Sequence, residues 1–169
     1  DLTPPEPGKV YDLEPCASCT LAELSSYSVD FLRPTDLVAA RWDGFIDSES
    51  GIVLYEFCVG SAQLQCDLLP LTEVGGPVIN GTLQTRNQVQ LNSTIGHSAV
   101  FCVSIRATNA VGLTSALVSS DCVTVDDTPP RMLHLRVGLD PKVHLDEQSN
   151  GDLIFGAGKA LDDISRVDM

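Results

Sequence analysis

Alternation of apolar and polar residues in the segment 101–108 constrains the fold of this chain most strongly. The apolar positions of that segment are Phe101, Val103, Ile105 and Ala107. A period of two is the pattern of a β-strand that buries one face. Further runs rich in β-forming residues lie at 37–42, 52–59, 89–91 and 118–125. No comparably long window has a helical period, so we predict an all-β chain.

Turn residues separate these runs and favour an antiparallel arrangement. Sequences suited to tight turns are Asp43-Gly44, Ser50-Gly51, Gly75-Gly76-Pro77, Asn80-Gly81 and the longer turn 109–112. Within the run 52–59, the residues expected on one buried face are Val53, Tyr55, Phe57 and Val59. Short strands at this spacing predict a two-sheet antiparallel β-sandwich.

A short repeat marks the edges of a module. Thr3-Pro4-Pro5 recurs as Thr128-Pro129-Pro130, and each copy follows an aspartate. Consecutive prolines favour an extended backbone, so we interpret the triplet as a stiff connector. The predicted parts are a connector at 1–5, a disulfide-containing β-sandwich at 6–127, a connector at 128–130, and the start of a second β module at 131–169. We expect the chain to be a piece of a longer protein with tandem modules.

Several residues of the first module resemble the fibronectin type III pattern. They are Trp42 near the end of one strand, Tyr55 and Phe57 on the next, and the segment 103–113. The segment 42–52, bracketed by Asp-x-Thr-Pro-Pro connectors, looks like modules repeated in very large extracellular proteins. The resemblance covers about residues 4–127 and implies an immunoglobulin/fibronectin type III-like β-sandwich. It says little about function, because this fold serves many functions.

Two features depart from that family pattern. Phe101 stands where the family usually places a tyrosine whose hydroxyl bonds to an upstream turn. The segment 16–34 has no counterpart in a minimal module. We therefore expect no tyrosine corner, and an additional loop after the first strand.

Six cysteines suit a secreted β domain with a few bridges. Residues equally distant from a hairpin turn lie opposite each other on antiparallel strands. The pairs predicted in this way are Cys102–Cys122 and Cys58–Cys66, and Cys16–Cys19 remains as a loop bridge. Cys16 and Cys19 also have the spacing of a redox motif or of half a zinc site. A redox motif needs a helix N-terminus, and a structural zinc site needs four ligands, which the sequence does not supply.

The charge balance excludes some partners. The chain carries 23 acidic residues against 10 lysines and arginines, a net charge of −13. Nucleic-acid binding requires a positive surface, so we expect no nucleic-acid partner. No apolar run is long enough for a membrane helix, and we expect no direct membrane insertion. The glycosylation sequons at Asn80 and Asn92 favour a secreted protein or the extracellular face of the cell surface.

Asp43, Asp47 and Glu49 form an acidic loop after the Trp42 strand. Calcium favours several carboxylate oxygens on an adaptable loop, so these residues are candidate calcium ligands. The same residues are also ordinary components of a solvated turn. Both interpretations stay open, and we expect no other cofactor.

The sequence favours a non-catalytic function. Gly156-Ala157-Gly158-Lys159 lacks the first glycine and the hydroxyl of a phosphate-binding loop, and no nucleophile elbow occurs. The first hypothesis is a stiff structural and interaction module that contacts neighbouring modules and other extracellular proteins. The alternative is a ligand-binding ectodomain module of a cell-surface receptor, which should expose a binding hot spot on its loops. A substrate-binding accessory domain would need exposed aromatic residues, which the sequence does not offer.

Overall fold

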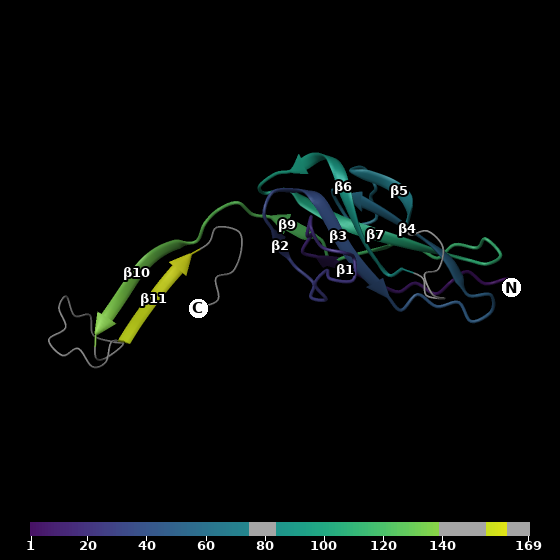
Figure 1. The fold of residues 1–169 in the computed structure, drawn as a ribbon, viewed down its shortest axis with the longest axis horizontal. Helices are drawn as coiled ribbons and strands as arrows, with labels where there is room; N and C mark the ends of the chain where they lie inside the picture. The colour runs from purple at the N-terminus through teal and green to yellow at the C-terminus, as the bar shows by residue number, and fades with distance from the viewer. Residues whose placement is uncertain (75–83, 139–154, 162–169) are drawn as a thin grey trace. The chain divides into compact units, whose positions relative to one another are not determined.

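The computed structural model describes residues 1–74, 84–138 and 155–161. The chain divides into two compact units, Asp1–Asp126 and Asp127–Met169. The described part of the chain contains β-strands and no helix, which confirms the all-β prediction (Figure 1). The strands of the first unit are β1 (Lys9–Leu13), β2 (Phe31–Leu32), β3 (Thr35–Asp43), β4 (Ile52–Gly60), β5 (Leu69–Val74), β6 (Arg86–Ile95), β7 (Val100–Asn109), β8 (Val118–Ser119) and β9 (Val123–Val125).

Two sheets make up the first unit. One has the strand order β1-β3-β6, and the other has the order β2-β9-β7-β4-β5 with β8 paired to β7. All strand pairs are antiparallel except the short parallel pair of β2 and β9. The two sheets bury one core between them, so the unit is a β-sandwich.

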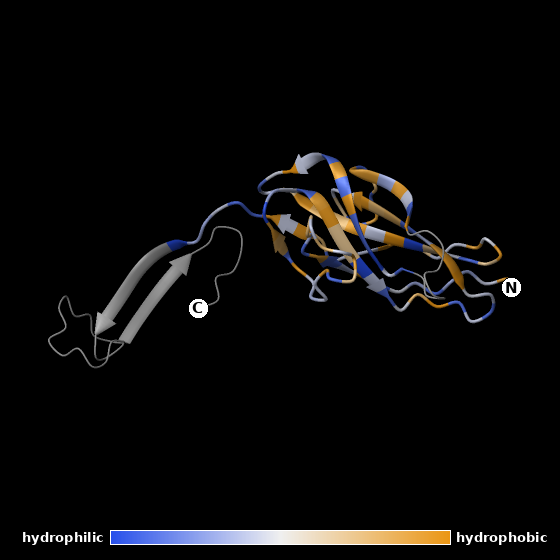
Figure 2. Cartoon of the chain, viewed as in Figure 1, coloured by the Kyte–Doolittle hydropathy of each residue, from blue (hydrophilic) through white to orange (hydrophobic). Residues whose placement is uncertain are grey.

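The core consists of the inward residues of both sheets. Its largest members include Trp42 on β3, Phe57 on β4 and Phe101 on β7, each at most 1% exposed. The Trp42 and Tyr55 rings meet edge to face, with centroids 5.4 Å apart. This geometry is favourable for aromatic pairs and joins the two sheets. Figure 2 shows the apolar residues of these strands in orange, alternating with more polar ones.

Two predicted strands differ in detail from the structure. Val53 is 52% exposed and lies outside the core, because the pairing of β4 with β7 shifts register between Ile52 and Leu54. The predicted strand 118–125 is two short strands, β8 and β9. Cys122 between them has a φ of 74°, which interrupts the extended backbone.

The second unit contains one antiparallel pair in its described part. This pair consists of β10 (Arg131–Gly138) and β11 (Phe155–Leu161). The pairing has an irregularity between Met132 and His134. Both strands lie in the segment 131–169, where the sequence predicts the start of a second β module.

Candidate functional site

Asn109, the last residue of β7, is the centre of the candidate site. Its side chain is buried, and its amide Nδ2 donates to Oδ2 of Asp47 at 2.9 Å and to Oδ2 of Asp1 at 2.8 Å. The same nitrogen lies 3.2 Å from the backbone oxygen of Thr3. One amide group therefore joins the N-terminal connector to the loop between β3 and β4.

The other side of the Asn109 amide holds the turn after β7. Its Oδ1 accepts hydrogen bonds from the amides of Val111 at 3.2 Å and Leu113 at 2.8 Å. The Asn109 backbone nitrogen also donates to the Leu113 carbonyl at 3.0 Å. Gly112 allows this tight turn, because its φ of 88° is unfavourable for residues with a Cβ. The side chain of Asn109 thus uses both its donor and its acceptor.

Asp47 organises the loop between β3 and β4. Its Oδ1 accepts from the backbone amides of Glu49 at 3.1 Å, Ser50 at 2.8 Å and Gly51 at 3.1 Å. Such side chain to backbone bonds are the usual role of aspartate in a turn. The pKa of Asp47 lies below its ordinary value, first because Asn109 donates to the carboxylate and then because the loop amides do.

The connector residues Asp1 to Thr3 are bound to this loop at further points. The Ser50 hydroxyl donates to Oδ2 of Asp1, and the Leu2 amide donates to Oε2 of Glu49 at 3.3 Å. Oδ1 of Asp1 accepts from the Thr3 amide at 3.1 Å. These bonds hold the connector against the module that follows it.

The predicted calcium ligands do not all share this cluster. Asp43 forms an ion pair with Arg41, with 3.0 Å between Oδ2 and Nη1. Asp47 and Glu49 lie in the cluster, where their oxygens accept from amides. Among the described residues, no three His, Cys, Asp or Glu side chains gather to hold a metal ion. Calcium binding stays a prediction.

Three disulfides join the cysteines in the pairs that the sequence indicates: Cys16–Cys19, Cys58–Cys66 and Cys102–Cys122. Cys102 and Cys122 follow the hairpin geometry, because the neighbouring pair Phe101 and Val123 are opposite each other on β7 and β9. Cys66 instead lies in the loop before β5, so the second bridge joins a strand to a loop.

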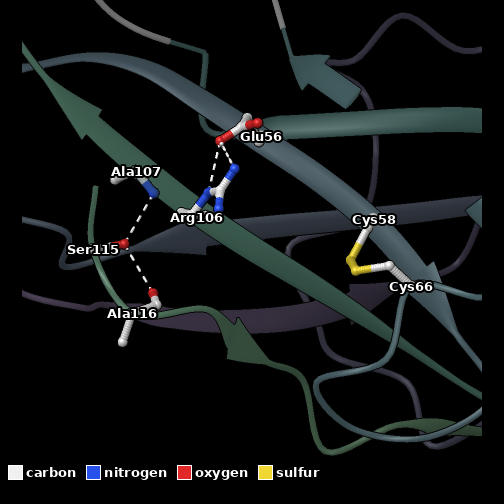
Figure 3. Close-up of polar contacts among 7 residues, drawn as sticks. All are labelled: Glu56, Cys58, Cys66, Arg106, Ala107, Ser115 and Ala116. Carbon is white, nitrogen blue, oxygen red and sulfur yellow. Dashed lines mark hydrogen bonds and ion pairs between the residues drawn. A yellow bond between two sulfur atoms is a disulfide. The ribbon is translucent and has the colours of Figure 1, made fainter. Parts of the chain in front are cut away.

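Figure 3 shows the Cys58–Cys66 bridge, an ion pair between β4 and β7, and two hydrogen bonds of Ser115. Arg106 on β7 forms an ion pair with Glu56 on β4, with 2.7 Å between Nη2 and Oε2. The Ser115 hydroxyl accepts from the Ala107 amide at 3.0 Å and donates to the Ala116 carbonyl at 2.9 Å. The bond from the Ala107 amide to Ser115 holds the segment that follows the Asn109 turn against β7.

The two glycosylation candidates differ in what the structure describes. Asn92 lies exposed on β6, where a glycan has room. Asn80 lies outside the described residues.

Asp12 on β1 is a buried carboxyl that sequence reasoning missed. It is 0% exposed, and neither carboxylate oxygen has a hydrogen-bond partner in the structure. Burial raises its pKa to about 7, and the neighbouring carboxylates of Asp121 and Asp30 add to the rise. The Ser120 hydroxyl and the Cys122 amide lie close enough to offset part of it. The only signal in the sequence was one acidic residue at an inward position of the apolar run Val10–Leu13.

Asn109 was also missed as the centre of the site. The sequence placed it in a turn, and it grouped Asp1 with the connector. The links from Asn109 to Asp1 and Asp47 span 108 and 62 residues. No local pattern reports contacts at that separation.

Comparison with protein-family models and with curated proteins finds no match to this chain. The class of the first unit is thus defined by its own structure, as a disulfide-bonded β-sandwich. Three disulfides indicate an oxidising environment of the kind found outside the cell. In the part of the chain that the structure describes, no helix has the length and apolar character to span a bilayer.

Proposed function

We propose that residues 1–126 form a non-catalytic structural and interaction module of a large secreted or cell-surface repeat protein. The module acts as a stiff spacer and as an adhesion or assembly unit. The observation that carries this proposal is the binding of the connector by Asn109, which donates to Asp1 and Asp47 together. A spacer transmits direction from one module to the next only if its connector is fixed to the module.

The second connector supports a repeated use of this contact. Asp126-Asp127-Thr128-Pro129-Pro130 repeats the spacing of the first connector, in which Asp1 and Thr3 contact Asn109. Tandem modules with fixed connectors would form a stiff array, because each joint loses its rotational freedom.

Fold and covalent chemistry also favour an extracellular module. The strand order β1-β3-β6 facing β5-β4-β7 supports the resemblance to fibronectin type III modules. Three bridges in one sandwich, together with the exposed sequon at Asn92, fit a secreted or cell-surface protein.

Backbone relaxation by NMR on the 169-residue chain tests the spacer function. The amides of Leu2 and Thr3 should have order parameters near those of β7, about 0.85 for a rigid backbone. Replacement of Asn109 by Asp should lower them, while the order parameters of β7 itself stay high. Values below about 0.6 for Leu2 and Thr3 in the unchanged protein would mean a flexible connector and would exclude the spacer function.

Two exposed residues favour a second candidate function, that of a receptor ectodomain module. Ile46 is 56% exposed and Val111 is 55% exposed, and both lie within two residues of the bond between Asp47 and Asn109. Apolar side chains on neighbouring loops can contact a ligand. Replacement of both by Ser separates the candidates, because a receptor module would lose ligand binding while the connector stays ordered.

A further inference from the structure

A groove with a volume of about 360 Å³ lies beside β1. Val10 and Tyr11 of β1 line one side, and Val118 and Ser119 of β8 line the other. Asp121 also lines it, immediately before the disulfide-bonded Cys122. The groove therefore runs between edge strands that belong to different sheets of the sandwich.

The backbone of β1 is open toward this groove at Val10. In the described part β1 pairs only with β3, with Tyr11 opposite Arg41. The backbone groups of Trp42 point to the other side of β3, because its amide donates to the Thr85 carbonyl at 3.0 Å. Since Val10 is the partner of Trp42, its N–H and C=O point away from β3.

One contact already shows that this edge accepts another segment of chain. The amide of Val29 donates to the carbonyl of Asp12 at 3.1 Å, on the outer side of β1. Ser28, next to Val29, lines the groove. The next outward backbone groups along β1 are those of Val10, so an added strand could continue from this contact.

Charge determines which segment would fit the groove. Asp121 is exposed at its wall, and the carboxylates of Asp121 and Asp30 both lie within electrostatic range of the buried Asp12. Lys9 is the one cation lining the groove, and it lies on the outward face of β1. The whole chain carries a net charge of −13, which disfavours both acidic segments and a second copy of this chain.

We propose that the groove binds an extended basic segment of another extracellular protein. The segment adds to β1 as a further strand, hydrogen-bonds to the backbone of Val10, and places a Lys or Arg beside Asp121. This proposal rests on the interaction role proposed for the module and names the chemistry of its partner.

Synthetic peptides serve as probes on the 169-residue chain. The basic probe is acetyl-Thr-Val-Arg-Val-Arg-Val-Thr-amide, and the acidic control has Glu in place of Arg. NMR titration should shift the amides of Val10, Asp12 and residues 118–121 with the basic probe only. The affinity should fall with added salt, because an ion pair at an exposed site is screened.

Two N-methylated forms of the basic probe test strand addition directly. One carries the methyl groups on the valine amides, and the other carries them on the arginine and C-terminal threonine amides. A strand bound to β1 uses only alternate amides, so one form should lose binding and the other should keep it. Equal binding of the two forms would contradict strand addition.

Charge reversal tests the role of Asp121. Asp121→Lys should weaken binding of the basic probe about tenfold, because a favourable contact becomes a like-charge contact. The matched control is Glu73→Lys on β5, an exposed residue on the other edge of the second sheet, which changes the net charge equally. Equal weakening by both variants would reduce the effect to net charge and overturn the proposal.

The remaining outcomes are also decisive. A dissociation constant of about 1 mM marks the weak end of specific binding. If about 1 mM probe causes no shift of the Val10 amide, the groove proposal is overturned. Shifts confined to β5 or β6, or concentration-dependent dimers without probe, would overturn it too. If the groove fails while Leu2 and Thr3 stay ordered, the spacer function still stands. If those two amides are disordered while the probe binds, the spacer function is wrong and the groove proposal still stands.

Discussion

The side-chain amide of Asn109 donates to Oδ2 of Asp47 over 2.9 Å, between the end of β7 and the loop after β3. Asp47 uses its other oxygen for three backbone amides of its own loop. Asn109 likewise uses its oxygen for the turn after β7. Asp47 thus holds the loop after β3, Asn109 holds the turn after β7, and the bond between the two side chains joins these loops. Nδ2 of Asn109 also donates to Asp1 of the connector.

The first prediction concerns Asn109→Asp. This change keeps an oxygen for the amides of Val111 and Leu113 but removes the donor, and it sets a third carboxylate beside Asp1 and Asp47. We expect a loss of unfolding free energy of about 2 kcal/mol at pH 7, typical of a disrupted buried hydrogen bond. The measurement is urea unfolding.

Acid provides the internal check on that prediction. In acid, once one of the three carboxyls is protonated, that carboxyl can donate, so the difference from the unchanged protein should shrink as the pH is lowered. Asn92→Asp, at an exposed position, is the matched control and should have little effect. An equal loss at both positions would show that Asn109 has no special role.

The second prediction concerns the pH dependence that Asp12 introduces. Its pKa is raised from 3.8 to about 7, so the folded state holds a proton that the unfolded state has lost between these values. The contribution of Asp12 to stability is therefore complete below about pH 4 and is lost as the pH rises to 7. A shift of about 3 pKa units corresponds to about 4 kcal/mol.

Asp12→Asn should remove this dependence, because the amide does not titrate. Relative to the unchanged protein, the variant should gain unfolding free energy as the pH increases from 4 to 8, measured by urea unfolding at each pH. The control is Asp36→Asn at an exposed position of β3. If the pH curves of the unchanged protein and Asp12→Asn are parallel, the pKa of Asp12 is the same in the folded and unfolded states, and the prediction is wrong.

The third prediction ranks two disulfides. The Cys102–Cys122 bridge closes a separation of 20 residues, and Cys58–Cys66 closes one of 8. The chain-entropy relation gives losses of about 3.3 and about 2.5 kcal/mol when each pair is replaced by Ala. Urea unfolding of the two double variants measures both. The reverse order would show that packing around Cys58 outweighs the entropy of the longer loop.

The fourth prediction is a glycan on Asn92 when the chain passes through a secretory pathway. Intact mass spectrometry should show a glycan that Asn92→Gln removes, with the thermal unfolding midpoint of the deglycosylated protein unchanged, because this side chain is exposed. Thr94→Ser keeps the sequon and should keep the glycan, whereas Thr94→Ala should remove it. A bare Asn92 in the secreted protein would contradict the prediction.

Strands with strong alternation were predictable from the sequence, and short or irregular ones were not. Segment 101–108 lies within β7, and the run 52–59 lies within β4. β1 spans five residues and β2 only two, too short for a periodic signal. β5 contains Pro70, which argues against a strand unless it lies at a sheet edge, and β5 is an edge strand. The exposure of Val53 was unpredictable, because a register shift depends on the partner strand.

By itself the sequence determined the all-β class, the turns and the pairing of Cys102 with Cys122 across the 109–112 turn, because these follow from local periodicity and from distance along the chain. Only the tertiary structure decided that Asn109 joins Asp1 to Asp47, that the side chain of Asp12 is buried, and that a groove lies between β1 and β8. These features depend on how two sheets face each other. The burial of a side chain and the direction of a free backbone edge are set by distant segments, which leave no pattern in the residues next to them.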